Sequence, residues 1–390
     1  MKEKTKVQIP RVMLLYHVMI PSVRLCGHSQ MEALAHMGMI EYRPVKMLQM
    51  TQEDFEWADI VVIGRLDGQA EYNLAQTFHD AGKRLIYVID DDLLNVPEGI
   101  QSAPHYAQEP IRQSILGMMG LSEGILSPSP LLLEKYATKE GQLKLLTEEP
   151  ALDAIPYAPH DPEAPIKIGF AGSVDRANDV QNLLGDALRQ IKKEYGDQVA
   201  FEFFGVEIPL AKELGARVLP YTMDYADYRR VLNESGWDIG LAPMPDSPFC
   251  ACKHYNKFIE YAAAGVVGIF SDHEPYARLH RTIGLGLFCE NTTEEWVNAL
   301  RSLIDDRAKL EDLRRQVCEC AAGPLNIDVI AQRLYEDMGP LLVPRKENAL
   351  ARCHLLWYKI RSVVERGWRA LKVYRWGIIA AVWRKLRGRS

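Results

Sequence analysis

Several common motifs are absent from this sequence of 390 residues. No Gly-x-Gly-x-x-Gly follows an expected strand, and there is no P-loop, no His-Glu-x-x-His and no Gly-x-Ser-x-Gly. These absences exclude dinucleotide-binding dehydrogenases, P-loop ATPases, zinc proteases and esterases. No run of 18 apolar residues occurs, so we expect no membrane-spanning helix.

Cysteine is scarce as well. The chain has seven cysteines, an odd number that lacks the density of a secreted disulfide scaffold. A short apolar stretch from Val12 to Ile20 is interrupted by His17 and is followed by no small-residue cleavage site, so no signal peptide is expected. These features predict a cytoplasmic protein.

Charge is unevenly distributed along the chain. The formal net charge is -6, but residues 345–390 hold 13 of the 46 Lys and Arg and only two of the 52 Asp and Glu. The tail therefore has a local balance of +11, and the preceding 344 residues have a balance of -17. This asymmetry indicates an anionic surface as a partner for the tail alone.

The length predicts two to three domains at about 150 residues each. In the first half, short apolar runs alternate with stretches long enough for crossover helices, which predicts a parallel α/β sheet. Five prolines between Pro150 and Pro165 indicate an inter-domain linker, after which a second α/β unit begins. The expected strands are 11–16, 60–64, 84–90 and 124–127, then 166–171, 199–205, 217–220, 239–243 and 266–271.

We therefore predict an α/β protein with two Rossmann-like, doubly wound domains that face a cleft. The predicted boundaries are 1–160 for the first domain, 161–340 for the second and 341–390 for a basic amphipathic helical tail. Ligands of doubly wound sheets bind at the carboxyl ends of the strands. The cleft between the domains is therefore the expected site.

The most informative segment runs from Lys253 to Asp272. Its pattern predicts a helix over about 256–264, ended by Gly265 and followed by a buried strand. Lys257 precedes Glu260 by one turn, and a cation near a helix N-terminus suits a diphosphate, whereas a carboxylate one turn deeper suits a ribose diol. An ordinary amphipathic helix with a solvated Lys257–Glu260 pair is the alternative.

The segment from Lys257 to Gly265, with the apolar strand and Ser271-Asp272 after it, resembles the donor-nucleotide helix of group 1 GT-B glycosyltransferases. Gly169-Phe-Ala-Gly172-Ser173 is similar to the strand and glycine turn that open the C-terminal domain of that family. Phe204-Gly205 and the run from Trp237 to Pro243 match its later strands, and a helix over 326–338 would return toward the first domain. The resemblance covers about residues 165–340.

This resemblance implies a metal-independent hexosyltransferase whose donor is a nucleoside diphosphate sugar, with no further cofactor and no metal ligands. It implies that Glu260 binds the ribose and that Lys257, with the following helix, faces the donor. Arg176 is the candidate for the basic side chain that stabilises the leaving diphosphate. The donor-binding residues would be Gly172, Ser173, Arg176, Lys253, Lys257 and Glu260. Retention of the sugar's anomeric configuration is a further expectation.

One position departs from the family pattern. Many members have a second glutamate eight residues before the ribose-binding one, and here that position is Cys252. The neighbouring Lys253 cannot replace it as a hydrogen-bond acceptor, because an ammonium group only donates. Sugar recognition must therefore differ from the common pattern, or catalysis is lost.

Asp90, Asp91 and Asp92 follow an expected strand on the ligand side of the first sheet. Three interpretations are open: a capping and turn cluster, an acid or base that serves the acceptor, and a divalent metal site. Of the functional interpretations we favour the second, and we name Asp91 and Asp92 with Arg176 and Lys257 as candidate catalytic residues. Weaker candidates are Arg24, His28, Arg65 and His105.

Residues 345–390 repeat apolar residues near helical spacing, and they contain four of the seven tryptophans among basic side chains. This pattern is typical of a helix that lies on an anionic membrane. Docking on the acidic body and binding to nucleic acid are alternatives, and we expect no nucleic-acid partner.

The combined expectation is a glycosyltransferase at the inner face of the membrane, attached peripherally by its tail. Its acceptor would be a glycan or a lipid-linked glycan of envelope polysaccharide biosynthesis. Two other functions stay open at this point: a nucleotide-sugar epimerase on the same fold, and a non-catalytic binding or scaffold subunit.

Overall fold

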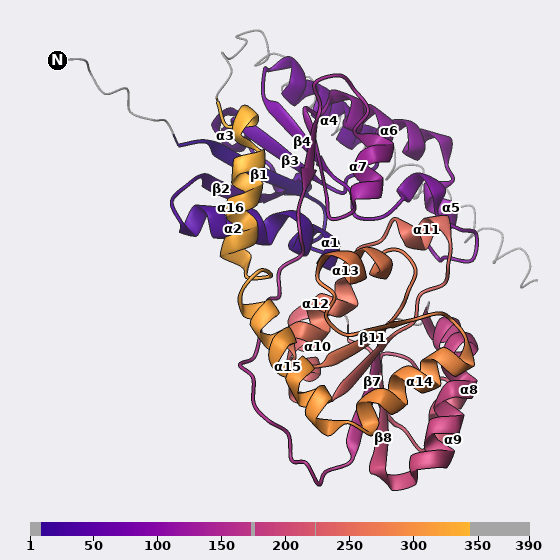
Figure 1. Cartoon of the computed structure of the whole chain (residues 1–390). Helices are drawn as coiled ribbons and strands as arrows, with labels where there is room; N and C mark the ends of the chain where they lie inside the picture. Colours follow the sequence, from indigo (N-terminus) through magenta and orange to yellow (C-terminus); the bar gives the residue numbers. More distant parts are fainter. Residues whose placement is uncertain (1–8, 173–175, 223, 344–390) are drawn as a thin grey trace, which may run out of the picture.

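A computed structural model describes residues 9–172, 176–222 and 224–343. The first half of the chain forms a parallel sheet in the strand order β2-β1-β3-β4-β5-β6 (Figure 1). All of its strands lie before residue 147, and the linker that follows carries no helix or strand from Thr147 to Pro165. The strands are β1 (Arg11–Tyr16), β2 (Glu41–Lys46), β3 (Ile60–Gly64), β4 (Arg84–Val88), β5 (Gly124–Ser127) and β6 (Leu143–Leu146).

A second parallel sheet follows the linker, in the order β12-β11-β10-β7-β8-β9. Both sheets carry helices on both faces, so the predicted α/β class with two doubly wound sheets is confirmed. The predicted C-terminal tail lies outside the described residues. The strands are β7 (Ile166–Ala171), β8 (Val199–Phe204), β9 (Arg217–Leu219), β10 (Ile239–Ala242), β11 (Val267–Ser271) and β12 (Leu287–Cys289).

The helices cover the sheets and fill the crossovers between parallel strands. In the first half they are α1 (Pro21–Val23), α2 (Ser29–His36), α3 (Gln52–Trp57), α4 (Gln69–Asp80), α5 (Ala103–Tyr106), α6 (Glu109–Leu121) and α7 (Pro130–Tyr136), with a π-helical turn at Arg24–His28. In the second half they are α8 (Ala177–Tyr195), α9 (Pro209–Leu214), α10 (Tyr225–Glu234), α11 (Pro248–Ala251), α12 (Asn256–Ala263), α13 (Tyr276–Thr282), α14 (Thr293–Ile304), α15 (Arg307–Ala322) and α16 (Ile327–Asp337). Within the described residues, no helix is both long and apolar enough to span a membrane.

Three strands were not predicted from the sequence: β2, β6 and β12. Each lies at an edge of its sheet, where one side lacks a neighbouring strand and the apolar run is weak. Every residue of β2 is exposed or half-exposed, and the strand contains Pro44. A proline is tolerated in an edge strand because it removes no hydrogen bond that the sheet requires there. The central strands were predicted because burial on both faces gives continuous apolar runs.

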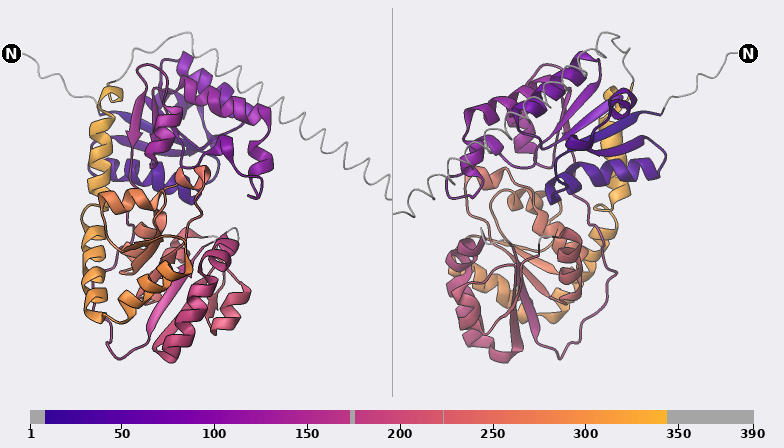
Figure 2. Two further views of the ribbon diagram at one scale, coloured as in Figure 1. Left: turned by 45° about the vertical axis from the view of Figure 1, so that its right-hand side comes forward. Right: turned by 180° about the vertical axis from the view of Figure 1, so that it is seen from behind.

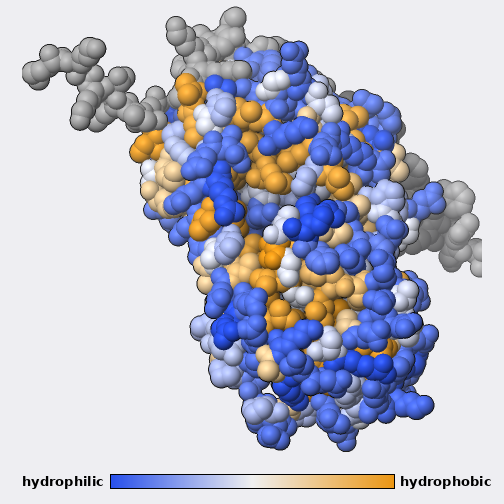
Figure 3. All heavy atoms as spheres, viewed as in Figure 1, coloured by the Kyte–Doolittle hydropathy of each residue, from blue (hydrophilic) through white to orange (hydrophobic). Residues whose placement is uncertain are grey.

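The core of each half is divided by its sheet into two layers. Along β1, Met13 and Leu15 belong to one buried cluster, while Val12 and Leu14 belong to the cluster on the opposite face. This alternation follows from the two-residue period of a strand. Over the face of the molecule in Figure 3, hydrophilic residues cover most of the surface and hydrophobic residues emerge in patches along the middle.

The last described helix, α16, returns from the second half to the first (Figures 1 and 2). Its residues Ala331 and Leu334, and Met338 directly after it, are buried in the same cluster as Val12 and Leu14 of β1. The helix begins after Asn326, whose side chain accepts a hydrogen bond from the backbone N–H of Asp328 at 2.9 Å. The predicted return helix is therefore confirmed, and it connects the two sheets a second time.

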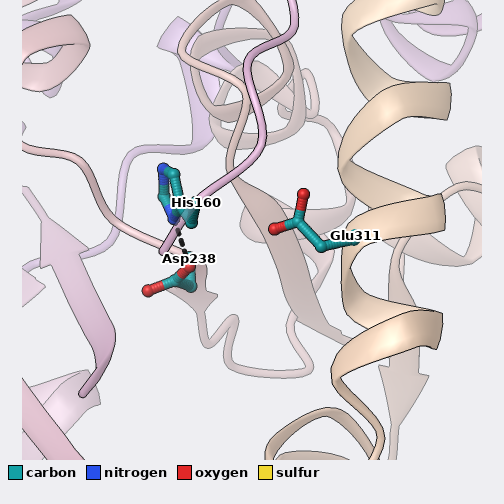
Figure 4. Close-up of side chains that lie close together, drawn as sticks. All are labelled: His160, Asp238 and Glu311. Carbon is teal, nitrogen blue, oxygen red and sulfur yellow. Dashed lines mark hydrogen bonds and ion pairs between the residues drawn. The ribbon is translucent and has the colours of Figure 1, made fainter. Parts of the chain in front are cut away.

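The linker is held to the second half by a cluster around His160 (Figure 4). The Nδ1 of His160 contacts Asp238, and ligand atoms of His160, Asp238 and Glu311 all lie within 4.8 Å of one another. Such a set could hold a metal ion. However, the guanidinium of Arg314 lies 2.7 Å from Nε2 of His160 and donates to Glu311 at 2.6 Å.

Arg314 determines how this cluster is interpreted. An arginine N–H can only donate, so Nε2 of His160 is the acceptor and its Nδ1–H donates to Asp238. Arg314 is 4% exposed and also donates to the backbone oxygen of Gly265 at 3.1 Å. Its buried positive charge supplies the counter-ion that the two carboxylates need. The cluster is thus an anchor for the linker.

We expect Arg314→Leu to destabilise the protein by about 3 kcal/mol, because it leaves buried partners unpaired. Urea unfolding followed by circular dichroism measures the change. Arg315→Leu is the matched control, since Arg315 is more than half exposed and pairs only with Asp312 in the described structure. Equal effects of the two substitutions would contradict the anchoring role of Arg314.

Candidate functional site

Two adjoining cavities lie at the carboxyl edge of the second sheet, where it faces the first half. One has a volume of about 240 Å³ and the other about 180 Å³. They share Gly172, Lys257 and Glu260 as lining residues. The smaller cavity is also lined by Pro21, the first residue of α1, so both halves of the chain contribute to its wall.

Helix α12 provides the wall between the cavities, and its end is fixed by local backbone geometry. Gly265 has a φ of +66°, a left-handed conformation that favours glycine. Its N–H donates to the backbone oxygen of Ala262 at 3.1 Å, and the N–H of Val266 donates to the backbone oxygen of Tyr261 at 2.9 Å. This pair of bonds is a Schellman motif, which ends the helix where the sequence predicts and leads directly into β11.

Glu260 lies at the centre of the site and is 8% exposed. Its Oε2 accepts hydrogen bonds from Lys257 Nζ at 2.6 Å and from Tyr228 Oη at 2.7 Å, and Lys257 also reaches Tyr228 at 2.9 Å. Among the described residues, every side-chain hydrogen bond to this carboxylate ends on Oε2. Oε1 is therefore left to accept hydrogen bonds from a ligand.

The Lys257–Glu260 pair predicted as an alternative is present, but the pair is not an ordinary solvated one. Tyr228 stacks on Phe204 with ring centroids 5.1 Å apart, which covers the pair from one side. Burial, followed by the charge of Glu260, raises the pKa of Tyr228 well above its ordinary value. Tyr228 thus stays a hydrogen-bond donor to Glu260.

Arg176 lines the larger cavity from the start of α8. Its guanidinium donates to the backbone oxygen of Pro243 at 2.5 Å, and its Nε lies 3.1 Å from Asp179. These contacts hold the side chain at the wall of the cavity that Lys257 also lines. Burial raises the pKa of Asp179, and the charge of Arg176 partly opposes that rise.

The glycine turn predicted after β7 allows two strand ends to approach closely. The N–H of Gly172 donates to the backbone oxygen of Phe204 at 3.0 Å. Gly205 has a φ of +83°, and a Cβ atom there would lie 2.3 Å from the backbone oxygen of Gly172. Only glycine fits at position 205. Ser173, a predicted binding residue beside this turn, lies outside the described residues.

The larger cavity gathers most of the residues predicted to bind a donor. Its lining contains three cations and one carboxylate: Arg176, Lys253, Lys257 and Glu260. This local excess of positive charge stands out in a body whose overall balance is -17. The N-terminus of α12 also lies at this cavity, and its cap position, Tyr255, makes no side-chain hydrogen bond to the helix. The cavity is therefore suited to an anion.

Lys253 connects this cavity to the first half. Its Nζ lies 2.8 Å from Asp91, which also faces Arg65 at 3.6 Å. Burial favours the neutral form of Asp91, but the charges of Lys253 and Arg65 outweigh it and hold its pKa below the ordinary value. Asp91 is thus ionised and paired across the domain junction.

Asp92 is placed differently from Asp91. It is 2% exposed and accepts hydrogen bonds from Lys135 at 2.6 Å, from Asn95 at 3.0 Å and from Tyr136. Neither Asp91 nor Asp92 lines either cavity. Their predicted catalytic role stays a prediction, and the contacts of Asp92 resemble those of the turn cluster considered as an alternative.

The weaker candidates also have structural partners. His28 lies 2.8 Å from Tyr42, His105 lies 2.8 Å from Asp67, and Arg65 pairs with Asp90 at 3.0 Å. Close to Asp90, the carboxyl of Glu149 is buried with the Cys26 thiol at 3.4 Å as a donor. Burial, followed by the nearby charge of Asp90, raises the pKa of Glu149 well above its ordinary value.

Several residues of the site were not predicted from the sequence. Tyr228, His254 and Asn256 line one cavity or the other. Glu148, from the linker after β6, lies 2.8 Å from both His254 and Tyr255. His254 and Asn256 belong to the segment that was singled out, so two polar residues between Lys253 and Lys257 were an available signal. No local signal pointed to Glu148.

Cys252, the position that departs from the family pattern, does not face the site. Its side chain is buried in the hydrophobic cluster of the first half, together with Leu93 and Leu94. It lines neither cavity. The loop before α12 is therefore docked on the first half through an apolar contact at this position.

Comparison with solved structures identifies the architecture. Neither a protein-family model nor a curated protein sequence matches the chain. The structure of Anabaena HepE in complex with UDP and glucose superposes with a TM-score of 0.57 at 14% identity, covering 84% of this chain and 99% of that chain. A glycosyltransferase from Rickettsia africae gives a TM-score of 0.54 at 12% identity, with 86% and 99% covered.

A third similar structure comes from Listeria monocytogenes and is assigned as a UDP-N-acetylglucosamine 2-epimerase. It has a TM-score of 0.52 at 13% identity and covers 87% of this chain and 99% of that chain. At such identities the likeness concerns the fold, and it extends over both sheets. Together with the two parallel sheets and the cleft between them, it shows that this chain has the GT-B fold.

Proposed function

We propose that the protein is a glycosyltransferase that moves a sugar from a nucleoside diphosphate sugar to an acceptor. The observation that carries the proposal is the larger cavity, where Arg176, Lys253 and Lys257 surround a single carboxylate. HepE, which has the same fold, was solved with UDP and glucose. A dianionic diphosphate is the ligand that this charge arrangement suits best.

The two cavities suggest how the donor is arranged. Aromatic rings dominate the smaller cavity, where Phe204, Tyr221, Tyr225 and Tyr228 offer stacking faces for a nucleobase. Glu260 separates this cavity from the cationic one, so its free Oε1 is suited to the ribose diol. The diphosphate would then lie among Arg176, Lys257 and the N-terminus of α12.

Transfer breaks the bond between the sugar's anomeric carbon and the diphosphate oxygen. Positive charge develops on the sugar, and negative charge develops on the leaving diphosphate. Arg176 and Lys257 are held in place before the reaction by their own hydrogen bonds, so they stabilise that negative charge with little reorganisation. We propose that these side chains, rather than a metal ion, meet the charge of the leaving group.

The acceptor and the setting are also part of the proposal. We assign a glycan or lipid-linked acceptor of envelope polysaccharide biosynthesis, reached from the inner face of the membrane. The support is the sequence of residues 345–390, where 13 basic residues accompany four tryptophans. Such a composition binds anionic membrane surfaces, and each cation contributes about 1 kcal/mol near the surface.

A nucleotide-sugar epimerase is the second candidate function, because a structure assigned to that activity shares the fold. Incubation of the protein with a nucleotide sugar and no acceptor separates the two candidates. An epimerase converts the sugar under those conditions, whereas a transferase leaves it unchanged apart from slow hydrolysis. A scaffold subunit would bind the nucleotide without either reaction.

Nucleoside diphosphates are expected to raise the melting temperature of the full chain. A ligand at 100 times its Kd stabilises the native state by about 2.7 kcal/mol, which corresponds to a shift of several degrees. A thermal-shift screen with UDP, GDP, ADP and TDP measures this effect. The absence of a shift with all four would contradict a nucleotide site.

Lys257→Met should lower kcat/KM for donor turnover by roughly 100-fold, the effect of removing one preorganised group that stabilises transition-state charge. Glu260→Gln should weaken nucleotide binding as well. The matched control is Arg230→Met, because Arg230 forms an exposed i,i+3 pair with Asp227. Turnover that survives both site substitutions at the level of the control would refute the site assignment.

Removal of residues 345–390 should abolish binding to vesicles that contain anionic lipid. Flotation of the full chain and of the shortened chain, at low and at high salt, measures the difference. The full chain should float at low salt and be released at high salt, because surface charge is screened. Equal flotation of both proteins would show that the tail is not the membrane contact.

A further inference from the structure

The first residue of α12 and the loop before that helix present two hydrogen-bond acceptors that have no partner within the described structure. Nδ1 of His254 and Oδ1 of Asn256 are both buried, and neither makes a hydrogen bond within the described structure. Both residues line the larger cavity. A buried polar atom without a partner costs free energy, so two of them beside one cavity indicate that a ligand completes their bonding.

The chemical character of His254 Nδ1 follows from its other ring nitrogen. Nε2 lies 2.8 Å from Glu148, whose carboxylate also accepts from Tyr255 at 2.8 Å. Burial raises the pKa of Glu148, but the hydrogen bonds that His254 and Tyr255 donate favour the ionised carboxylate, and the pKa lies below its ordinary value. The ionised carboxylate can only accept, so Nε2 carries the proton.

In the neutral imidazole, Nδ1 therefore has a free lone pair and is an acceptor. The side chain of His254 is 2% exposed, which restricts it to this orientation. Glu148 belongs to the linker after β6, whereas His254 belongs to the second half. The acceptor is thus oriented by a contact that crosses the domain junction.

The charge of the cavity decides which ligand group can meet these two acceptors. Phosphate oxygens at neutral pH carry no proton to donate, and they are already matched by Arg176, Lys253 and Lys257. A metal ion would have to enter among those three cations. Neutral hydroxyl groups remain, since an O–H donates to a nitrogen or carbonyl acceptor and adds no charge.

We infer that His254 Nδ1 and Asn256 Oδ1 bind hydroxyl groups of the donor's sugar, and that they determine which sugar is accepted. This inference rests on the proposed function, which places the diphosphate in the same cavity. Cys252 offers no acceptor there, because it is packed into the core of the first half. His254 and Asn256 supply acceptors two and four residues further along the chain, from the loop before α12 and from the first residue of that helix.

The test compares the Kd of UDP-glucose with the Kd of UDP by isothermal titration calorimetry on the full chain. Another nucleotide pair replaces these probes if the thermal-shift screen favours another base. The measured quantity is the Kd of UDP-glucose divided by the Kd of UDP. His254→Ala and Asn256→Ala should each raise this ratio by about fivefold, as expected for one lost hydrogen bond. Neither substitution should change the Kd of the nucleoside diphosphate.

Two further variants serve as controls. Asn256→Asp keeps an acceptor at the same place and should keep the wild-type ratio. His79→Ala removes a half-exposed histidine on α4 that lines neither cavity, and should change neither Kd. If His254→Ala fails to fold because Glu148 loses its partner, Asn256→Ala and Asn256→Asp decide the question without disturbing that contact.

The possible results separate the inference from the proposed function. If the alanine variants keep the wild-type ratio of the two Kd values, His254 and Asn256 do not bind the sugar. If they weaken the binding of UDP-glucose and of UDP equally, the two residues act at the diphosphate instead, which also overturns the sugar role. A wild-type protein that binds no nucleoside diphosphate would overturn the proposed function itself, and the inference with it.

Discussion

The hydrogen-bonded group of Glu260, Lys257 and Tyr228 is the interaction on which the site depends. A buried carboxylate is costly unless it is paired and hydrogen-bonded, and here a cation and a phenol meet the same oxygen. The other oxygen is left for a ligand at the boundary of two cavities. Three elements must be in place for this arrangement: α12 carries Glu260 and Lys257, α10 carries Tyr228, and the end of β8 carries the ring that stacks on Tyr228.

Paired side chains also join the two halves of the chain beside the site. Lys253 reaches Asp91 of the first half, and His254 reaches Glu148 of the linker. Both residues belong to the loop that lines the larger cavity. The position of the first half therefore fixes the side chains that face a ligand bound to the second. The return of α16 to β1, through a shared hydrophobic cluster, adds a second connection that restrains the two halves.

Much of the fold could be predicted from the sequence, because strands buried on both faces leave continuous apolar runs. The end of α12 at Gly265 was equally predictable, because a glycine after a helical pattern commonly ends the helix in a left-handed conformation. The turn at Gly172 and Gly205 was indicated by the family resemblance. The edge strands β2, β6 and β12 were not, because burial on one side leaves little pattern. The residues of α12 were predicted as a site through charge spacing and resemblance. Glu148 and Tyr228 could not be, because 106 and 32 residues separate them from their partners.

The central claim is that Glu260 and its neighbours receive the nucleoside diphosphate of a sugar donor. A crystal structure of the full chain with a nucleoside diphosphate tests it most directly. The account predicts ribose hydroxyls within hydrogen-bond distance of Glu260 Oε1, with the diphosphate between Arg176 and Lys257. A nucleotide bound elsewhere, or one whose phosphates avoid both cations, would contradict it.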